Sequence, residues 1–366
     1  MTRNPRYLQL ADRRTFLTGA TASLATAGLA LGCPLRAGTT PREGLREEKP
    51  PAELVTESTQ RAIDRGLGYL ARRQIRSGPN RGAYGTSGYA SGVAVASLSG
   101  LSMMCGGSAP AEGKYGKEVE RSVEFVLSQV RNSGYIARRD NAANENMYGH
   151  GFAMLFLSEA YGMTRKAQIG EKLRSAVALT VKAQNDEGGW RYQPVKSDAD
   201  LSITVCQIMG LRAARDAGIH VPDETREKCI EYVRKSQNAN GSFRYTMRGG
   251  HSTFAMTAAG VTSLYSAGIY DSEQVKKALQ HLLQHKPTGS GSASHYFYAH
   301  YYAVQAMWHA GGEYWNQWYP AIRDELLTRQ NTDGSWTSQM AGSEFGTAMA
   351  GIILQMPLNF LPVFSP

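Results

Sequence analysis

The chain has 366 residues, of which 42% are hydrophobic, so it is long enough for one large domain or two ordinary ones with a substantial core. Its formal charge is +9, and a short N-terminal group of charged residues accounts for three of these units: Arg3, Arg6, Arg13, Arg14 and Asp12. The other basic residues are scattered over predicted helix faces, which argues against nucleic acid as a partner.

The first 33 residues are typical of an export signal. Arg13 and Arg14 form a twin arginine, and Phe16 and Leu17 lead into a weakly apolar run of Ala, Leu, Gly and Thr. This order of blocks resembles a twin-arginine signal, which implies export of a folded protein to the bacterial periplasm or cell envelope. A disordered basic tail is the alternative interpretation.

The residues after this signal predict how the folded part is attached. Residues 30–33, Ala-Leu-Gly-Cys, resemble a lipoprotein cleavage box with alanine where leucine is usual. Cys33 is therefore a candidate lipid anchor, and such an anchor is the only membrane contact that we expect. Residues 34–56 are rich in proline and charge and show no apolar face, so we expect a flexible linker before a folded domain at 57–366.

A glutamine, a glycine and an aromatic residue recur at fixed spacing along the rest of the chain. The pattern QxxxGxW or QxxxGxF occurs as QNDEGGW at 184–190, QNANGSF at 237–243 and QNTDGSW at 330–336. Weaker copies lie at 65–74, 129–135 and 277–291. Six units of about 45 to 55 residues then fill the chain from Glu57 onward, which is typical of a helical-repeat protein.

Each unit predicts two helices of different character. The first is charged and amphipathic and ends near the glutamine, at 59–73, 118–129, 172–184, 225–237, 273–284 and 320–330. The second is almost free of charge, at 88–105, 147–161, 201–217, 253–267, 296–310 and 345–355. A helix without a polar face is buried all round, so these segments predict an inner ring inside an outer ring. The expected fold is all-α, an (α/α)6 toroid of six helical hairpins.

One of the uncharged segments allows another interpretation. Residues 88–105 contain 18 uncharged residues, which is long enough to suggest a membrane span. Their Gly and Ser content and their counterparts at the repeat period favour an inner helix instead.

The QxxxGxW units resemble those of the terpenoid cyclase and protein prenyltransferase superfamily, whose fold is the α/α toroid. More narrowly, residues 198–222, 298–330 and 345–364 are similar to exported bacterial prenyltransferase/squalene-oxidase-repeat proteins of unassigned activity. The resemblance covers about residues 57–366. It implies that the glutamine and the aromatic residue brace one helix end against the next unit, and that the ring encloses a cavity for an isoprenoid or another apolar ligand.

In such a toroid the inner helices begin at one mouth, where unpaired N–H groups create a positive potential. The residues expected there include acids and imidazoles, namely Glu145, His150, Asp198, Asp200, His251, His295, His300 and Glu344. Aromatic residues are interleaved with them, namely Tyr148, Phe152, Phe254, Tyr296, Tyr298, Tyr301 and Tyr302. We expect a ligand to be bound by Glu145, Tyr148, His150, Phe254, Tyr298, His300 and Glu344. For His150 and His300, a hydrogen-bonded place between packed helices is an equal alternative.

Two family motifs bear on catalysis by Asp200. Triterpene cyclases protonate their substrate with the middle aspartate of Asp-x-Asp-Asp, and Asp198 and Asp200 match the first two positions while Leu201 replaces the last. The resemblance then implies that Asp200 is the acid, with Asp198 beside it raising its pKa. The alternative is that either aspartate caps the helix that begins at Leu201.

The second motif concerns zinc. Protein prenyltransferases bind zinc through Asp-x-Cys and a later His, and here Asp200 and His251 match whereas Ser202 replaces the thiolate. Two ligands are too few for catalytic zinc, so we expect no metal and no cofactor. His251 remains a catalytic candidate with Asp200 and Asp198.

Two further functional classes stay open at this point. Many α/α barrels act on glycans with two carboxyl groups, which Glu145, Asp200 and Glu344 could supply at a separation of about 5 to 9.5 Å. The other class is a non-catalytic binding or scaffold protein of the cell envelope, whose partner protein the sequence does not identify. The motifs are incomplete, so the sequence leaves open whether the protein is an enzyme.

Overall fold

The computed structural model describes residues 51–85, 88–138, 146–287 and 295–365. The predicted export signal, Cys33, most of the linker and Glu145 lie outside these residues, and the expectations about them stay predictions. The described residues belong to one compact unit, Leu45–Pro366. The expected boundary between linker and domain at residue 57 also stays a prediction.

Amphipathic and uncharged helices alternate along this unit. The outer helices are α4 (Glu57–Arg73), α6 (Gly116–Ser128), α8 (Ala167–Ala183), α10 (Asp223–Lys235), α12 (Glu273–Leu283) and α14 (Gly312–Arg329). The inner helices are α5 (Val93–Cys105), α7 (Met147–Thr164), α9 (Leu201–Asp216), α11 (Phe254–Ser266), α13 (Tyr296–Ala310) and α15 (Gly342–Gln355). Short elements complete the unit: α3 (Pro51–Leu54), η2 (Tyr89–Ser91), η4 (Met356–Leu358), η5 (Pro362–Phe364), β1 (Arg244–Thr246) and β2 (Gly249–Ser252).

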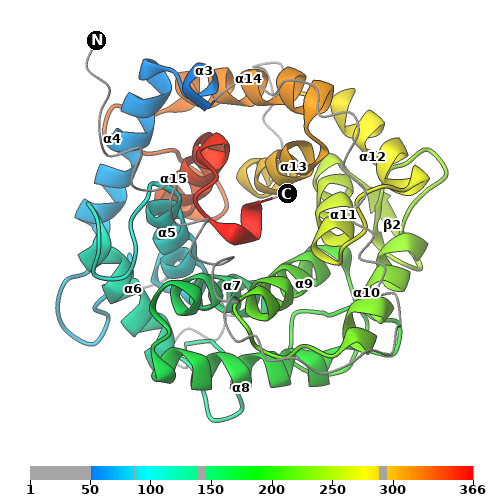
Figure 1. Cartoon of the computed structure of the whole chain (residues 1–366), viewed down its shortest axis with the longest axis horizontal. Helices are drawn as coiled ribbons and strands as arrows, with labels where there is room; N and C mark the ends of the chain where they lie inside the picture. The colour runs from blue at the N-terminus through cyan, green and yellow to red at the C-terminus, as the bar shows by residue number, and fades with distance from the viewer. Residues whose placement is uncertain (1–50, 86–87, 139–145, 288–294, 366) are drawn as a thin grey trace, which may run out of the picture. The chain divides into compact units, whose positions relative to one another are not determined.

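The two kinds of helix form two rings (Figure 1). Each inner helix contacts the inner helices of both neighbouring units, and α15 contacts α5, so the inner ring is closed. On α4 the apolar residues Ile63, Leu67 and Leu70 are buried, whereas Glu57 and Arg61 are exposed. The predicted all-α (α/α)6 toroid is therefore confirmed.

The repeated glutamine joins adjacent units. Gln184 Nε2 donates to the carbonyl of Gly188 in its own turn (2.9 Å) and to the carbonyl of Thr225 in the first turn of α10 (2.9 Å). Gln330 does the same with Gly334 (3.0 Å) and with Ala62 of α4 (2.9 Å), which joins the last unit to the first. The motif aromatic residue fixes the turn to the outer helix of its own unit, because the Trp190 indole donates to the Thr180 carbonyl of α8 (2.8 Å).

Three details differ from the sequence-based expectation. Helix α14 begins at Gly312, and Pro320 lies inside it because Trp315, Trp318 and Tyr319 are buried and extend the packed face toward the N-terminus. Helix α5 begins at Val93, after a 3-10 turn. The hairpin of β1 and β2, which pair antiparallel, has no helical period and was not expected.

The uncharged segment at 88–105 forms the 13-residue helix α5, which packs between α7 and α15. Within the described ranges, none of the helices combines the length and the apolarity that crossing a bilayer requires.

Candidate functional site

Asp200 is the N-cap of inner helix α9 and is fully buried. Its Oδ1 accepts a hydrogen bond from the Ile203 backbone N–H (2.9 Å) and another from the Ser202 hydroxyl. Its own N–H donates to the Trp190 carbonyl (3.0 Å), so the QNDEGGW turn fixes the start of the helix. The capping role considered for Asp200 is thus present in the structure.

The other carboxylate oxygen of Asp200 is in a different environment. Oδ2 is buried and accepts no hydrogen bond, and Arg191 Nη1 lies 3.4 Å from it. Burial raises the pKa of this carboxyl above its ordinary value, against the opposing effects of Ser202, Ile203, Arg191 and the Tyr245 hydroxyl. A carboxyl group that retains its proton to higher pH is suited to act as a general acid.

Four tyrosines surround this carboxyl group. The Tyr148 hydroxyl is hydrogen-bonded to the Ser202 hydroxyl, and the Tyr298 hydroxyl donates to the Ser202 carbonyl (2.8 Å). The hydroxyls of Tyr192 and Tyr245 are 2.6 Å apart, and the Arg191 guanidinium lies over both rings at 5.0 and 5.6 Å from their centroids. We call this set the Asp200 cluster: Asp200, Ser202, Arg191, Tyr148, Tyr192, Tyr245 and Tyr298.

Below the cluster, side chains of α13 cross the ring. The Tyr302 hydroxyl lies 3.0 Å from Cys206 Sγ of α9, and the Tyr301 ring meets Phe152 of α7 edge-on, with centroids 5.9 Å apart. Both tyrosines are fully buried. Helices α7 and α9 are not neighbours of α13 in the ring, so these contacts pass through the lumen and fill it with aromatic side chains.

The predicted site residues are divided between this cluster and other places. The structure brings together Asp200, Tyr148 and Tyr298, whereas Asp198 is exposed at the edge, with Arg191 Nη1 3.5 Å from its carboxylate. His251 lies on the exposed strand β2.

Three of the predicted ligand-binding residues, His150, Glu344 and His300, face the outer ring. His150 is buried and uses both ring nitrogens, with the Ile136 N–H at 3.1 Å and the Thr180 hydroxyl at 2.9 Å, and burial lowers its pKa to about 4. The Glu344 carboxylate accepts from Arg73 Nε of α4 at 2.8 Å. His300 packs against Trp318 of α14 and against Phe254, with ring centroids 5.6 and 5.2 Å away. Burial lowers the pKa of His300 to about 3.

Several members of the cluster were not expected from the sequence, although a signal for two of them exists. Tyr192 follows Trp190 by two positions, and Tyr245 follows Phe243 by two positions in the next unit. Aligning the units on the motif aromatic residue therefore places both tyrosines at equivalent sites. Arg191 lies between Trp190 and Tyr192 in the same turn.

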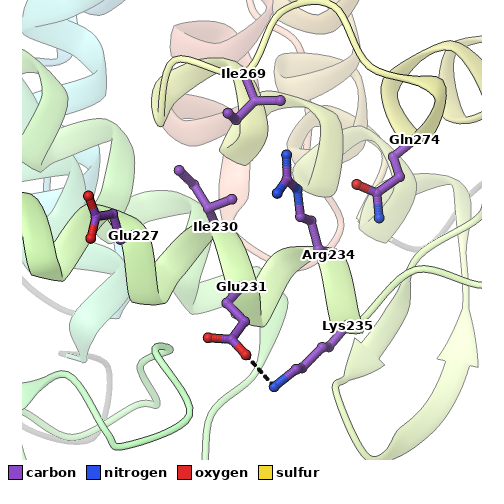
Figure 2. Close-up of a pocket in the computed structure, with 7 residues that line it drawn as sticks. All are labelled: Glu227, Ile230, Glu231, Arg234, Lys235, Ile269 and Gln274. Carbon is purple, nitrogen blue, oxygen red and sulfur yellow. Dashed lines mark ion pairs between the residues drawn. The ribbon is translucent and has the colours of Figure 1, made fainter.

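Two of the surface hollows outside the ring centre bear on the position of the site. One of about 470 Å³ is bordered by Asp198, Ala199, Lys196 and the hairpin residues Thr246 to Arg248, and it adjoins the Asp200 cluster. The other, of about 560 Å³, lies on the outer surface between α10 and the residues near Ile269 and Gln274 (Figure 2). Ile230 and Ile269 line it, and the Glu231–Lys235 ion pair lies at its edge, so it is separate from the cluster.

The described part of the chain contains no group of three His, Cys, Asp or Glu side chains placed to hold a metal ion. Asp200 and His251, the two candidate zinc ligands, are respectively buried at the start of α9 and exposed on β2.

The closed inner ring and the outer ring of helices around it define the α/α-toroid class of proteins. No protein-family model and no curated protein sequence matches the chain. Among solved structures it is similar to the type II terpene cyclase MstE from Scytonema, with 14% identity, a TM-score of 0.57 and coverage of 84% of this chain and 100% of that one. Cellobiose 2-epimerase from Bacillus thermoamylovorans is similar at 11% identity, a TM-score of 0.60 and 82% and 98% coverage. An alpha-amylase from Clostridium perfringens is similar at 11% identity, a TM-score of 0.57 and 80% and 97% coverage. At these identities the likeness establishes the toroid fold, and the chemistry must be argued from the site.

Proposed function

We propose that the protein binds an isoprenoid or similarly apolar ligand at the Asp200 end of the ring and protonates it from Asp200, in the manner of a cyclase or transferase. The observation that supports this is the buried carboxyl group of Asp200, whose Oδ2 lies 3.4 Å from Arg191 Nη1 and within an aromatic cluster. Among the similar structures, MstE is seen with its substrate geranylgeranyl dihydroxybenzoate, so this type of ring can hold a prenyl chain.

The proposed reaction is balanced without a cofactor. The Asp200 O–H bond breaks as its proton adds to an alkene carbon, and the resulting carbocation lies among tyrosine rings whose faces stabilise positive charge. Loss of a proton from the product cation restores the proton count, so the overall change is an isomerisation. Arg191 then stabilises the Asp200 carboxylate that protonation of the ligand leaves behind.

A second function is favoured by a different observation. Asn146 caps α7 and Thr253 caps α11 at the positions that correspond to Asp200, so a capping role alone explains a polar residue there. In that case the ring is a binding or scaffold protein without catalysis. For either function we propose twin-arginine export to the cell envelope, for which Arg13 and Arg14 are the support.

The Asp200→Asn variant distinguishes the role of Asp200 as a general acid from its role as the N-cap of α9. Asparagine caps helices about as well as aspartate but cannot donate the carboxyl proton, so the fold is retained while protonation is lost. Purified protein is incubated with squalene or geranylgeraniol, and isomers of unchanged mass are sought by gas chromatography and mass spectrometry. We expect at least a 100-fold loss of product, in the range typical for removing a general acid.

Asp198→Asn is the matched control, because Asp198 is exposed and also lies beside Arg191. Equal product formation by wild type and Asp200→Asn would exclude acid catalysis by Asp200. If both bind the isoprenoid and neither converts it, the binding function is retained and the enzyme is rejected.

A further inference from the structure

The chain that follows α15 enters the ring from the end opposite to Asp200. Figure 1 shows this segment turning into the middle of the inner ring after α15. Leu361, Val363 and Phe364 are buried, while Pro362 remains exposed. Three apolar side chains of this segment therefore occupy space that the inner helices enclose.

Two polar contacts and one aromatic contact hold the segment. The Val363 N–H donates to Glu159 Oε1 of α7 (3.2 Å), and Arg212 Nη2 of α9 donates to the Ser365 carbonyl (3.3 Å). The Phe364 ring meets Tyr301 edge-on, with centroids 6.3 Å apart. Both hydrogen bonds use main-chain groups of the segment, so it is recognised by shape and apolar character as much as by the identity of its side chains.

Aromatic contacts continue from this segment to the Asp200 cluster. Tyr301 contacts Tyr302 at a centroid distance of 4.9 Å, and Tyr302 contacts Tyr298 at 4.8 Å. Phe364 is thus the last member of a row of edge-on aromatic contacts that begins at the cluster. An apolar chain that extends past Tyr298 overlaps this row, so part of the row must move to admit it.

The segment is the part of this row that does not belong to an inner helix. Helix α13 is fixed by α11, α14 and α15, whereas residues 361–365 follow a turn at Asn359, whose φ is +50°. The Ser365 hydroxyl donates to Asn359 Oδ1 (2.9 Å), which closes the segment on itself. It can therefore leave as one small loop without unfolding an inner helix.

We propose that residues Leu361–Ser365 are a plug that occupies the lumen in the free protein, and that a long apolar ligand binds by displacing it. This inference extends the proposed function, since it states how the lumen opens to such a ligand. The plug competes with the ligand for the same space, so the observed affinity is lowered by the fraction of molecules in which the plug is in place.

The test measures binding and plug release in the whole protein. Phe364→Ala weakens the plug, and Glu171→Ala, on an exposed part of the outer helix α8, is the control. The probe is the neutral fluorophore N-phenyl-1-naphthylamine, with geranylgeraniol as competitor. We expect Phe364→Ala to bind the probe about tenfold more tightly than wild type, and Glu171→Ala to bind as wild type does.

Hydrogen exchange of the wild type gives a second measurement, which applies even if Phe364→Ala does not fold. Geranylgeraniol should accelerate exchange of the Val363 amide, because displacement breaks its bond to Glu159. The plug proposal would be overturned if the Val363 amide exchanged at an unchanged or slower rate with ligand bound. It would also be overturned if neither the wild type nor Phe364→Ala bound N-phenyl-1-naphthylamine or geranylgeraniol. Neither measurement depends on Asp200. A failure of the plug can therefore be distinguished from a failure of the acid function, which the Asp200→Asn variant tests.

Discussion

Glu159 is a carboxyl group buried inside the ring, and its environment makes stability depend on pH. Burial, with a smaller effect of the nearby Asp216, raises its pKa to about 8 against the opposing effects of the Val363 N–H and Arg212. Cys105 is the other ionisable neighbour. The folded-state pKa lies above the ordinary value of 4.5, so the folded state binds the proton more tightly than the unfolded chain does. Its contribution to stability is complete below about pH 4.5 and declines as pH rises to about 8.

Glu159→Gln should remove this pH dependence. We expect the wild type to lose a few kcal/mol of unfolding free energy between pH 5 and 9 relative to the variant, because a glutamine cannot ionise. Thermal unfolding followed by circular dichroism across this range gives the difference. Glu171→Gln, on an exposed part of α8, is the control and should keep the wild-type pH profile. Parallel profiles for wild type and Glu159→Gln would contradict the prediction.

The sequence could predict only part of the candidate site, for a reason that applies to single residues. Asp200, Tyr148 and Tyr298 were expected at the ring mouth because each lies near the predicted start of an inner helix. His150 and Glu344 met the same criterion, yet both face the outer ring. An inner helix has no polar face, so its sequence does not show which side is turned to the lumen.

At the scale of elements, the glycine of each motif lets a turn approach the next outer helix closely. Gly188 has φ +97°, and a Cβ built on it would lie 2.1 Å from the Lys228 carbonyl oxygen of α10. The obstacle is backbone, so it cannot rotate away. This explains why the glycine was a good predictor of the fold. The motif occurs where a turn contacts the outer helix of the next unit, and this contact recurs once in each repeat.

Gly188→Ala should therefore destabilise the protein by at least about 2 kcal/mol, through the left-handed backbone and the contact with α10. Gly162→Ala on α7 is the control, because nothing lies within 4 Å of its added Cβ, and it should be neutral or slightly stabilising. Chemical denaturation of both variants measures the difference. A Gly188→Ala protein as stable as wild type would show that the turn can move away from α10.

Elements outside the repeat were less predictable. Among the residues that the structure describes, the β1–β2 hairpin and residues 361–365 have no counterpart in the other units, so comparing units gives no information about them. The hairpin contributes Tyr245 to the Asp200 cluster, and the later segment fills the lumen. The repeated scaffold was thus predictable from its period, whereas Tyr245 and residues 361–365 lie on insertions into that period.

At the scale of the whole molecule, closure of the ring distinguishes this protein from open helical arrays, whose terminal repeats have only one neighbour. Here α4, the first outer helix, is bound by the last motif through Gln330 and Ala62. Arg65 Nη2 also donates to the Asn331 carbonyl (2.7 Å) across the same joint. The first unit should therefore be as well protected as the interior ones.

Gln330→Ala removes the side-chain bridge at this closing joint, and Gln237→Ala removes the equivalent bridge to Gly241 and Gln274 at an interior joint. Each variant loses two hydrogen bonds, about 1 to 3 kcal/mol in total, so the two should be destabilised by similar amounts.

The part of the ring that loses protection from hydrogen exchange should differ between the two variants. Hydrogen exchange in α4 should become roughly tenfold faster or more in Gln330→Ala, since 1.4 kcal/mol corresponds to a factor of ten, whereas Gln237→Ala should leave it near the wild-type rate. If α4 already exchanges rapidly in the wild type, the joint does not stabilise the first unit and the ring behaves as an open array. If α4 is protected and Gln330→Ala alone exposes it, closure stabilises the first unit as the neighbouring units stabilise each interior one.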